Sequence, residues 1–95
     1  MWYILFMEFE WDPKKAESNL RKHAIPFDYA VRIFLDNNRL ERVDNRTDYG
    51  ETRWITIGLV NDQEIAVSYT LRNETIRIIS ARKAERHERE NYWNR

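Results

Sequence analysis

Alternation of apolar and polar residues predicts a strand near the start of the chain. Met7, Phe9 and Trp11 alternate with acidic residues, a pattern typical of a strand with one buried face. The residues before them, 1–6, are mostly apolar but too few for a signal peptide or a membrane span. They are either an upstream translation start, with Met7 as the native one, or an extension of this strand.

Two helices are predicted to follow this strand. Asp12 and Pro13 are typical of a helix start, because the carboxylate accepts free N–H groups and proline fits the first turn. We expect this helix to run to about Lys22 and, with its thin apolar stripe, to make few core contacts. A second helix is predicted over 27–34, where apolar residues fall at i, i+3, i+4 and i+7, and the polar run 36–38 ends it.

The second half of the chain predicts strands and a last helix. A short strand is expected at Leu40–Val43, followed by a polar loop over 44–51. Further strands are predicted over 54–60, 64–71 and 75–81, and a helix over 83–94. The turns between these strands are short, which demands antiparallel neighbours. The last helix is poor in apolar residues, so we expect it to be weakly anchored and open to displacement by a partner.

The order β-α-α-β-β-β-β-α predicts an α+β domain spanning residues 1–95. Its antiparallel β-sheet would carry two N-terminal helices packed on one face and a C-terminal helix.

Composition narrows the chemistry. The chain has no cysteine and two histidines outside any metal-binding spacing, so we expect no disulfide, no metal and no cofactor, and a cytoplasmic location. Its 16 basic and 16 acidic residues cancel, which is unusual for a nucleic-acid binder. The charge is segregated, however: residues 72–95 hold seven Lys or Arg against four acids, a net of +3. A local basic patch of this kind is enough to attract phosphate.

Basic groups also gather at the end of the first predicted helix. Arg21, Lys22 and His23 lie where the helix macrodipole is negative, and the second helix starts a few residues later. A cationic cluster that contains a histidine is what a phosphate-handling surface needs.

Three segments resemble the BrnT family of bacterial toxins: the stretch 10–30, the run Ile76–Ala84 and the pattern Glu88-Arg89-x-x-Tyr92. The resemblance extends from about Glu8 to Tyr92. It implies a RelE/ParE-like fold and a metal-independent ribonuclease that inhibits translation as part of a type II toxin–antitoxin pair. It also implies a BrnA-like ribbon-helix-helix antitoxin, with which the toxin represses their operon and through which alone it meets operator DNA.

Metal-independent RNA cleavage needs a base near the attacking ribose 2′-OH, cations on the phosphate and an acid at the leaving oxygen. The catalytic candidates are Lys22, His23, Arg53, Arg77 and Arg82. Candidate RNA contacts are Lys83, Arg86, Arg89 and Tyr92.

Each candidate also has a purely structural interpretation. Lys22 and His23 suit a helix C-terminus by charge alone, and Arg53 could cap a strand with a salt bridge. Arg77 interrupts an isoleucine-rich strand, which is costly unless the guanidinium is paired or lies on an open face. Five residues apart on one strand, Arg77 and Arg82 would point to opposite faces unless a bulge intervenes.

Near the chain end, helical i,i+4 pairing could account for Glu88 and Arg89, and docking of the last helix is the favoured role for Tyr92. Ala24 occupies the position after the Lys-His pair, where family members usually carry glycine. A left-handed alanine there would cost about 1 kcal/mol.

Two other functions remain open. The chain could be a non-catalytic binding module, such as a co-repressor or an RNA-binding domain, or a ParE-like gyrase poison. Convergence of His23, Lys22, Arg53 and one of Arg77 or Arg82 on one exposed surface would favour the ribonuclease.

Overall fold

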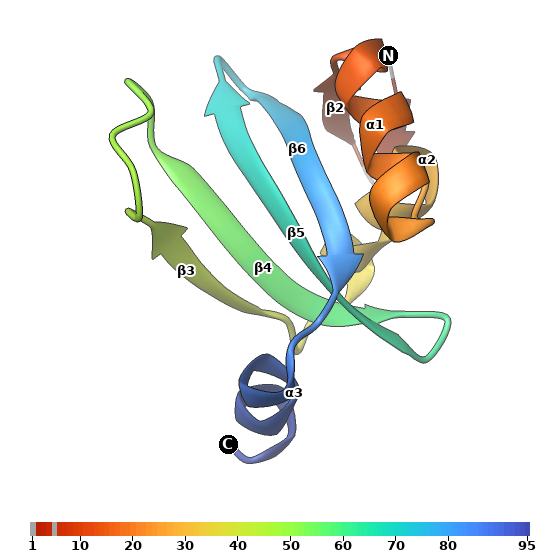
Figure 1. Cartoon of the computed structure of the whole chain (residues 1–95), viewed down its shortest axis with the longest axis vertical. Helices are drawn as coiled ribbons and strands as arrows, with labels where there is room; N and C mark the ends of the chain where they lie inside the picture. Colours follow the sequence, from red (N-terminus) through yellow and green to blue (C-terminus); the bar gives the residue numbers. More distant parts are fainter. Residues whose placement is uncertain (1, 5) are drawn as a thin grey trace.

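A six-stranded sheet in the order β1-β2-β6-β5-β4-β3 organises the described part of the chain, residues 2–4 and 6–95 of a computed structural model (Figure 1). The strands are β1 (Trp2–Ile4), β2 (Met7–Trp11), β3 (Leu40–Asp44), β4 (Arg53–Val60), β5 (Gln63–Arg72) and β6 (Thr75–Lys83). The helical segments are α1 (Pro13–His23), α2 (Phe27–Ala30), the 3₁₀ segment η1 (Val31–Leu35) and α3 (Arg86–Trp93). All the predicted elements are present, with ends that differ by a few residues.

The prediction of an antiparallel sheet is only partly right. The strands β3 to β6 are antiparallel neighbours, as their short connections demand. In contrast, β2 is parallel to β6, with Phe9 opposite Ile76. Since these two strands are far apart in the sequence, no short turn fixes their relative direction.

The residues before β2 do not extend it. They include the separate strand β1, which pairs antiparallel with β2, so that Tyr3 lies opposite Glu8. The interpretation of residues 1–6 as an extension of the first predicted strand is therefore wrong for residues 2–4. Met1, which with Met7 is one of the two candidate translation starts, lies outside the described residues.

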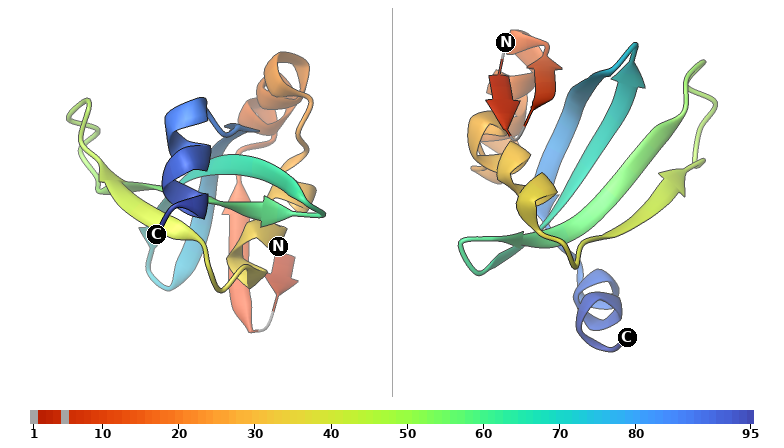
Figure 2. Two further views of the ribbon diagram at one scale, coloured as in Figure 1. Left: turned by 90° about the horizontal axis from the view of Figure 1, so that it is seen from below. Right: turned by 180° about the vertical axis from the view of Figure 1, so that it is seen from behind.

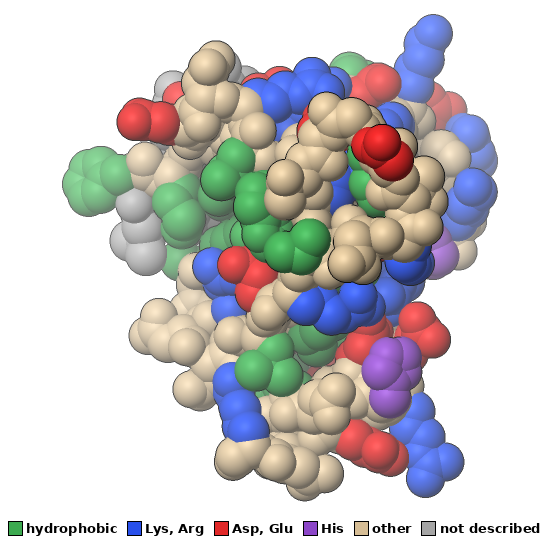
Figure 3. Space-filling view, turned by 90° about the vertical axis from the view of Figure 1, so that its left-hand side faces the viewer, with side chains coloured by type: hydrophobic (Ala, Val, Ile, Leu, Met, Phe, Trp, Pro, Cys, Tyr) green, Lys and Arg blue, Asp and Glu red, His purple; other side chains and the backbone are tan. Residues whose placement is uncertain are grey.

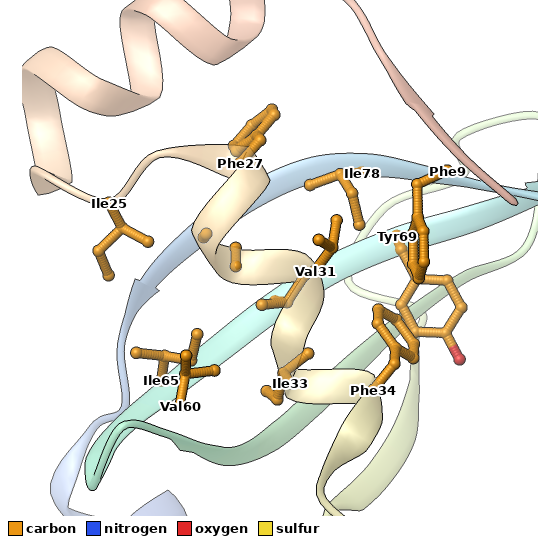
Figure 4. Packing of buried hydrophobic residues seen from close by; sticks show 13 residues of the cluster. Phe9, Ile25, Phe27, Val31, Ile33, Phe34, Val60, Ile65, Tyr69 and Ile78 are labelled. Carbon is orange, nitrogen blue, oxygen red and sulfur yellow. The ribbon is translucent and has the colours of Figure 1, made fainter. Parts of the chain in front are cut away.

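One face of the sheet is covered by α2 and η1 (Figure 2, right). The predicted second helix tightens into a 3₁₀ segment after Ala30, and Ile33 of η1 is fully buried against the sheet. Phe9, Tyr69 and Ile78 meet this segment from three different strands (Figure 4). Removal of these apolar side chains from water is the main stabilisation of the fold.

The first helix is not packed flat on this face as predicted, but lies beside β6 beyond the end of β2 (Figure 1). The buried side chain of Asn19 takes the place of a neighbouring strand. Its Oδ1 accepts from the Ala81 N–H at 3.0 Å, and its Nδ2 donates to the Ala81 carbonyl at 2.9 Å. Nδ2 also donates to the Ile25 carbonyl at 3.1 Å. Polar contacts therefore supplement the thin apolar stripe of α1.

The last helix covers one end of the other face of the sheet. Tyr92 and Ala84 pack there with Ile55, Ile57 and Ala66. The Tyr92 hydroxyl donates to Asp36 at 2.6 Å, and Trp93 Nε1 donates to Glu64 at 2.7 Å. The apolar contact is small, as predicted, but these hydrogen bonds anchor α3 more firmly than its composition suggests.

Candidate functional site

A β-bulge in β6 places Arg77 and Arg82 on the same face of the sheet. The β5–β6 register shifts by one residue, which leaves Ile79 without a partner on β5. Arg77 then lies opposite Thr70, and Arg82 lies opposite Ala66. Both arginines therefore occupy the face away from α2 and η1. The sequence allowed this only if a bulge lay between them, and the bulge is present.

We call the part of this face outside the α3 cluster of Ile55, Ile57 and Ala66 the open face. It is defined by Arg53, Ser68, Thr70, Arg77, Ser80 and Arg82, of which Thr70 is only 2% exposed. It lies between α1 at the β6 edge and α3 at the lower end of the sheet (Figure 1). From the side of β3, Lys and Arg side chains form a band above α3, with acidic side chains beside them (Figure 3). Basic and acidic groups are thus intermixed along this edge of the sheet.

An arginine row crosses the open face. Arg53, Thr70, Arg77 and Glu10 lie opposite one another on β4, β5, β6 and β2. Two strand spacings separate the two arginines, which corresponds to about 10 Å between their backbones. Their side chains remain 21% and 24% exposed. They can therefore contact a ligand on this face.

Carboxylates orient both arginines of the row. Arg77 contacts Glu10 at 2.5 Å, while Arg53 contacts Glu51 at 3.1 Å and lies 3.9 Å above the Tyr49 ring. The four side chains are 21–34% exposed, so these ion pairs are partly shielded from water. A phosphate that binds either arginine must displace its carboxylate.

Arg82 is held more tightly, by Glu88 of α3. Its Nη1 and Nη2 donate to the two carboxylate oxygens at 2.7 and 3.0 Å. The Glu88 side chain is only 3% exposed. Burial raises the pKa of this carboxyl, but hydrogen bonds from Arg82 and from the Glu85 backbone N–H outweigh it and bring the pKa to about 2. Arg82 is thus committed to α3 before any ligand arrives.

Lys22 and His23 lie on the exposed end of α1 and line a depression of about 190 Å³. The other lining residues are Lys15, Ser18, Asn19, Ile79 and Ser80. Within the described residues, neither Lys22 nor His23 forms an ion pair, in contrast to the arginines of the open face. This depression therefore offers cationic groups that need not give up an internal partner.

A row of paired residues that begins with two serines connects this depression with the far edge of the sheet. Ser80 lies opposite Ser68, Ser68 opposite Ile55, and Ile55 opposite Arg42 of β3. We call this the serine row. It spans three strand spacings, about 14 Å, with the arginine row on one side and Arg82 on the other. The catalytic candidates thus border one face but do not meet at a single point.

The candidate RNA contacts lie apart from these rows. Lys83 ends β6 on the opposite side from Arg82 and, with Arg89, lines a separate depression at the β4–β5 turn. Arg86 pairs with Glu90 at 2.9 Å on the surface of α3. Tyr92 is buried and its hydroxyl donates to Asp36, so it lies in the contact between α3 and the sheet, as the docking interpretation expects. Its assignment as an RNA contact stays a prediction.

One sequence prediction at α3 is wrong, and one at the end of α1 is confirmed. Helical i,i+4 pairing does not account for Glu88 and Arg89, because Glu88 binds Arg82 and Arg89 donates to the Ala84 carbonyl at 2.7 Å. Ala24 adopts the left-handed conformation considered above, with φ of 58°, and its N–H donates to the Leu20 carbonyl. The backbone next to His23 is therefore strained.

Sequence reasoning did not identify Asn19, Lys15 or the two serines of the row. A buried asparagine on a helix looks the same in sequence as an exposed one. Its position one turn after Ala16 and one turn before His23 was the available signal, since that stripe faces the sheet. The serines become visible only once the bulge sets the register of β6.

Among residues 2–4 and 6–95, no group of three or more His, Cys, Asp or Glu side chains is arranged to hold a metal ion. No helix in that part of the chain is long and apolar enough to cross a membrane.

Comparison with known proteins assigns most of this sequence to a family. Residues 11–88 match the family model described as "Ribonuclease toxin, BrnT, of type II toxin-antitoxin system". A search of curated proteins gives no match. The matched segment runs from the end of β2 to Glu88 and so includes α1, the arginine row from Arg53 to Arg77, and Arg82. The chain belongs to the BrnT family of ribonuclease toxins of type II toxin–antitoxin systems.

Proposed function

We propose that this BrnT protein is a metal-independent endoribonuclease that cleaves RNA on the open face and thereby inhibits translation in the cytoplasm. The observation that carries the proposal is the bulge in β6, which brings Arg77 and Arg82 to the face that also bears Arg53 and borders Lys22 and His23. Membership of a ribonuclease toxin family supports the reaction class.

The arginine row is proposed to hold the phosphate that is attacked. Arginine remains charged at all relevant pH values and binds phosphate oxygens through two parallel N–H groups. Arg53 and Arg77 are pre-oriented by Glu51 and Glu10, so little side-chain entropy is lost when a phosphate takes the place of a carboxylate. Negative charge that develops on the phosphate in the transition state would be stabilised by the same groups.

His23 is proposed to transfer protons, with Lys22 as a second cation beside it. Histidine is the side chain best suited to act as acid and base in the neutral range. Its position near Ser80 places it at one end of the serine row, within reach of a nucleotide that lies across the sheet.

A type II family implies a protein antitoxin as partner. We propose a BrnA-like antitoxin with a ribbon-helix-helix domain, which covers the open face, neutralises the toxin and represses the operon together with it. The zero net charge of the chain supports a division of labour in which the antitoxin alone contacts operator DNA. We also expect the fold to group with RelE/ParE-like toxins.

The pairing of the arginines favours one alternative, a non-catalytic binding module. Arg82 is fixed by buried Glu88, and both arginines of the row already have acidic partners. A degenerate toxin that only binds its antitoxin would tolerate this arrangement.

An RNA cleavage assay decides between the two. Purified chain is incubated with a long RNA in the presence of EDTA, and the ends of the products are identified. We expect cleavage that leaves 2′,3′-cyclic phosphate and 5′-hydroxyl ends, reduced roughly 100-fold or more by Arg77→Ala or His23→Ala. Lys14→Ala, an exposed position at the start of α1, should cleave like the wild type. Intact RNA with the folded wild-type chain would favour the binding module.

A further inference from the structure

A second depression on the same face of the sheet lies between β3, β4 and α3. Its volume is about 240 Å³, below the 300–1,000 Å³ range that is usual for sites of drug-sized ligands. The floor is apolar and formed by Leu40, Ile55 and Ile57. The rim carries Arg42 of β3 and the side chains of His87 and Asn91 on α3. The size and shape suit a single small ring system, not a large ligand.

The acids at this depression do not face an incoming ligand as free charges. Glu88 is occupied by Arg82 and by the Glu85 N–H, and its Oε2 also pairs with Arg42 Nη2 at 3.5 Å. Glu41 lies opposite Thr56 on the other face of β3, where its carboxylate accepts from Tyr69 and Arg39. One carboxylate, Glu88, is thus shared by Arg42 and Arg82, which leaves an excess of positive charge at the rim. Asn91 is exposed, and within the described residues its amide has no hydrogen-bond partner, so it is available to a ligand.

The position of the depression connects it to the candidate site. Ile55 of its floor belongs to the serine row, and Arg42 is the last residue of that row. Arg53 is two residues from Ile55 on the same face of β4, which corresponds to about 7 Å. A nucleotide chain whose phosphate contacts Arg53 and Arg77 can therefore place a neighbouring base over Ile55 and Ile57.

We propose that this depression is a nucleobase pocket that gives the enzyme a base preference beside the cleaved bond. One unstacked base lies against Ile55, Ile57 and Leu40. The Asn91 amide pairs with the edge of the base, and Arg42 contacts its phosphate. This inference rests on the proposed ribonuclease function, since it assumes that RNA crosses the open face.

Two features favour RNA over an apolar side chain of a protein partner. The rim is cationic and neutral, which complements a phosphate-linked ligand. An asparagine amide without an internal partner can donate and accept at once, which matches the adjacent donor and acceptor groups on a base edge.

Binding is tested directly with mononucleotides. The methyl signals of Ile55 and Ile57 are followed by NMR in the full chain while AMP, GMP, CMP and UMP are added separately. We expect saturable shifts with a preferred base, and roughly fivefold or greater weakening of that preferred nucleotide in Asn91→Ala. Asn45→Ala, an exposed asparagine in the loop before β4, is the matched control and should bind like the wild type.

Cleavage mapping separates this proposal from the function on which it rests. Asn91→Ala should relax the base preference at one position, measured as the ratio of cleavage rates at the preferred base and at the other bases. Arg77→Ala should lower cleavage at all sites and keep the preference. If the wild type cleaves no RNA, the proposed ribonuclease function is wrong. The mononucleotide titration then still shows whether the pocket binds a base. Methyl signals that no nucleotide moves, or that respond only to the antitoxin, would overturn the nucleobase pocket.

Discussion

The two faces of the sheet are built from alternate residues of the same strands, yet they differ in burial and charge. On the covered face, Phe9, Ile33, Val67 and Ile78 are almost completely removed from water and carry no charge. On the open face, the intervening positions hold arginines, serines and a threonine. The arginines form ion pairs, and the other side chains carry hydroxyl groups. The comparison teaches that the larger apolar cluster lies on one face, while the other combines a smaller cluster under α3 with ion pairs that range from partly exposed, at Arg53 and Arg77, to buried, at Glu88.

Truncation of a covered side chain tests the stabilising half of this comparison and should have the largest effect. Phe9→Ala removes a fully buried ring that packs against Phe34, so we expect the free energy of unfolding to fall by about 3–5 kcal/mol. Urea denaturation measures the change. Phe6→Ala, at a fully exposed phenylalanine, should change it by less than about 0.5 kcal/mol. Equal losses in the two variants would remove the distinction between covered and exposed positions.

The edge of β6 offers a polar counterpart. Asn19→Ala leaves the Ala81 N–H and carbonyl without their present partners, so we expect a loss of about 2–3 kcal/mol in unfolding free energy. Ser18→Ala changes the adjacent residue of the same helix and should lie within about 0.5 kcal/mol of the wild type. A loss below about 0.5 kcal/mol in Asn19→Ala would show that α1 does not depend on this side chain.

Acid should reveal the buried contact between the open face and α3. Because the pKa of Glu88 is lowered to about 2 in the folded chain, its ionised form stabilises the fold above pH 4.5, and this stabilisation is lost as the pH falls toward 2. Between pH 6 and pH 3, the wild type should lose about 2 kcal/mol more than Glu88→Gln. The exposed control Glu90→Gln should follow the wild type. Identical pH profiles for wild type and Glu88→Gln would contradict the assigned Arg82–Glu88 pair.

The smallest effect is expected at the corner beside His23. Ala24→Gly relieves the left-handed strain but adds freedom to the unfolded chain, so we expect a net stabilisation of about 0.5–1 kcal/mol. Thermal unfolding measures it. Ala84→Gly, at a buried alanine, should instead destabilise. A loss of stability in Ala24→Gly would mean that the left-handed alanine is not strained.

Much of the fold follows from local patterns in the sequence. Alternation at Met7–Trp11, the cap at Asp12 and the short turns between β4, β5 and β6 each predict an element that is present. The parallel pairing of β2 with β6 was not predictable in this way. It depends on contacts between distant parts of the chain, for which local periodicity gives no direction.

The site was predictable in kind but not in detail. Arg77, within an isoleucine-rich strand, indicated a guanidinium that is paired or lies on an open part of the sheet, and it is both paired with Glu10 and 24% exposed. The bulge at Ile79 and the burial of Glu88 were not predictable. One depends on the register of two strands and the other on where α3 docks.

The central claim is that RNA binds the open face, and chemical-shift mapping with an uncleavable RNA tests it most directly. A short oligonucleotide with 2′-O-methyl groups is added to the labelled chain at low salt. The account predicts the largest backbone shifts at Arg53, Ser68, Arg77 and Ser80, with none at Lys83. Shifts confined to Lys83 and Arg89 at the β4–β5 turn, or spread over the covered face, would contradict it.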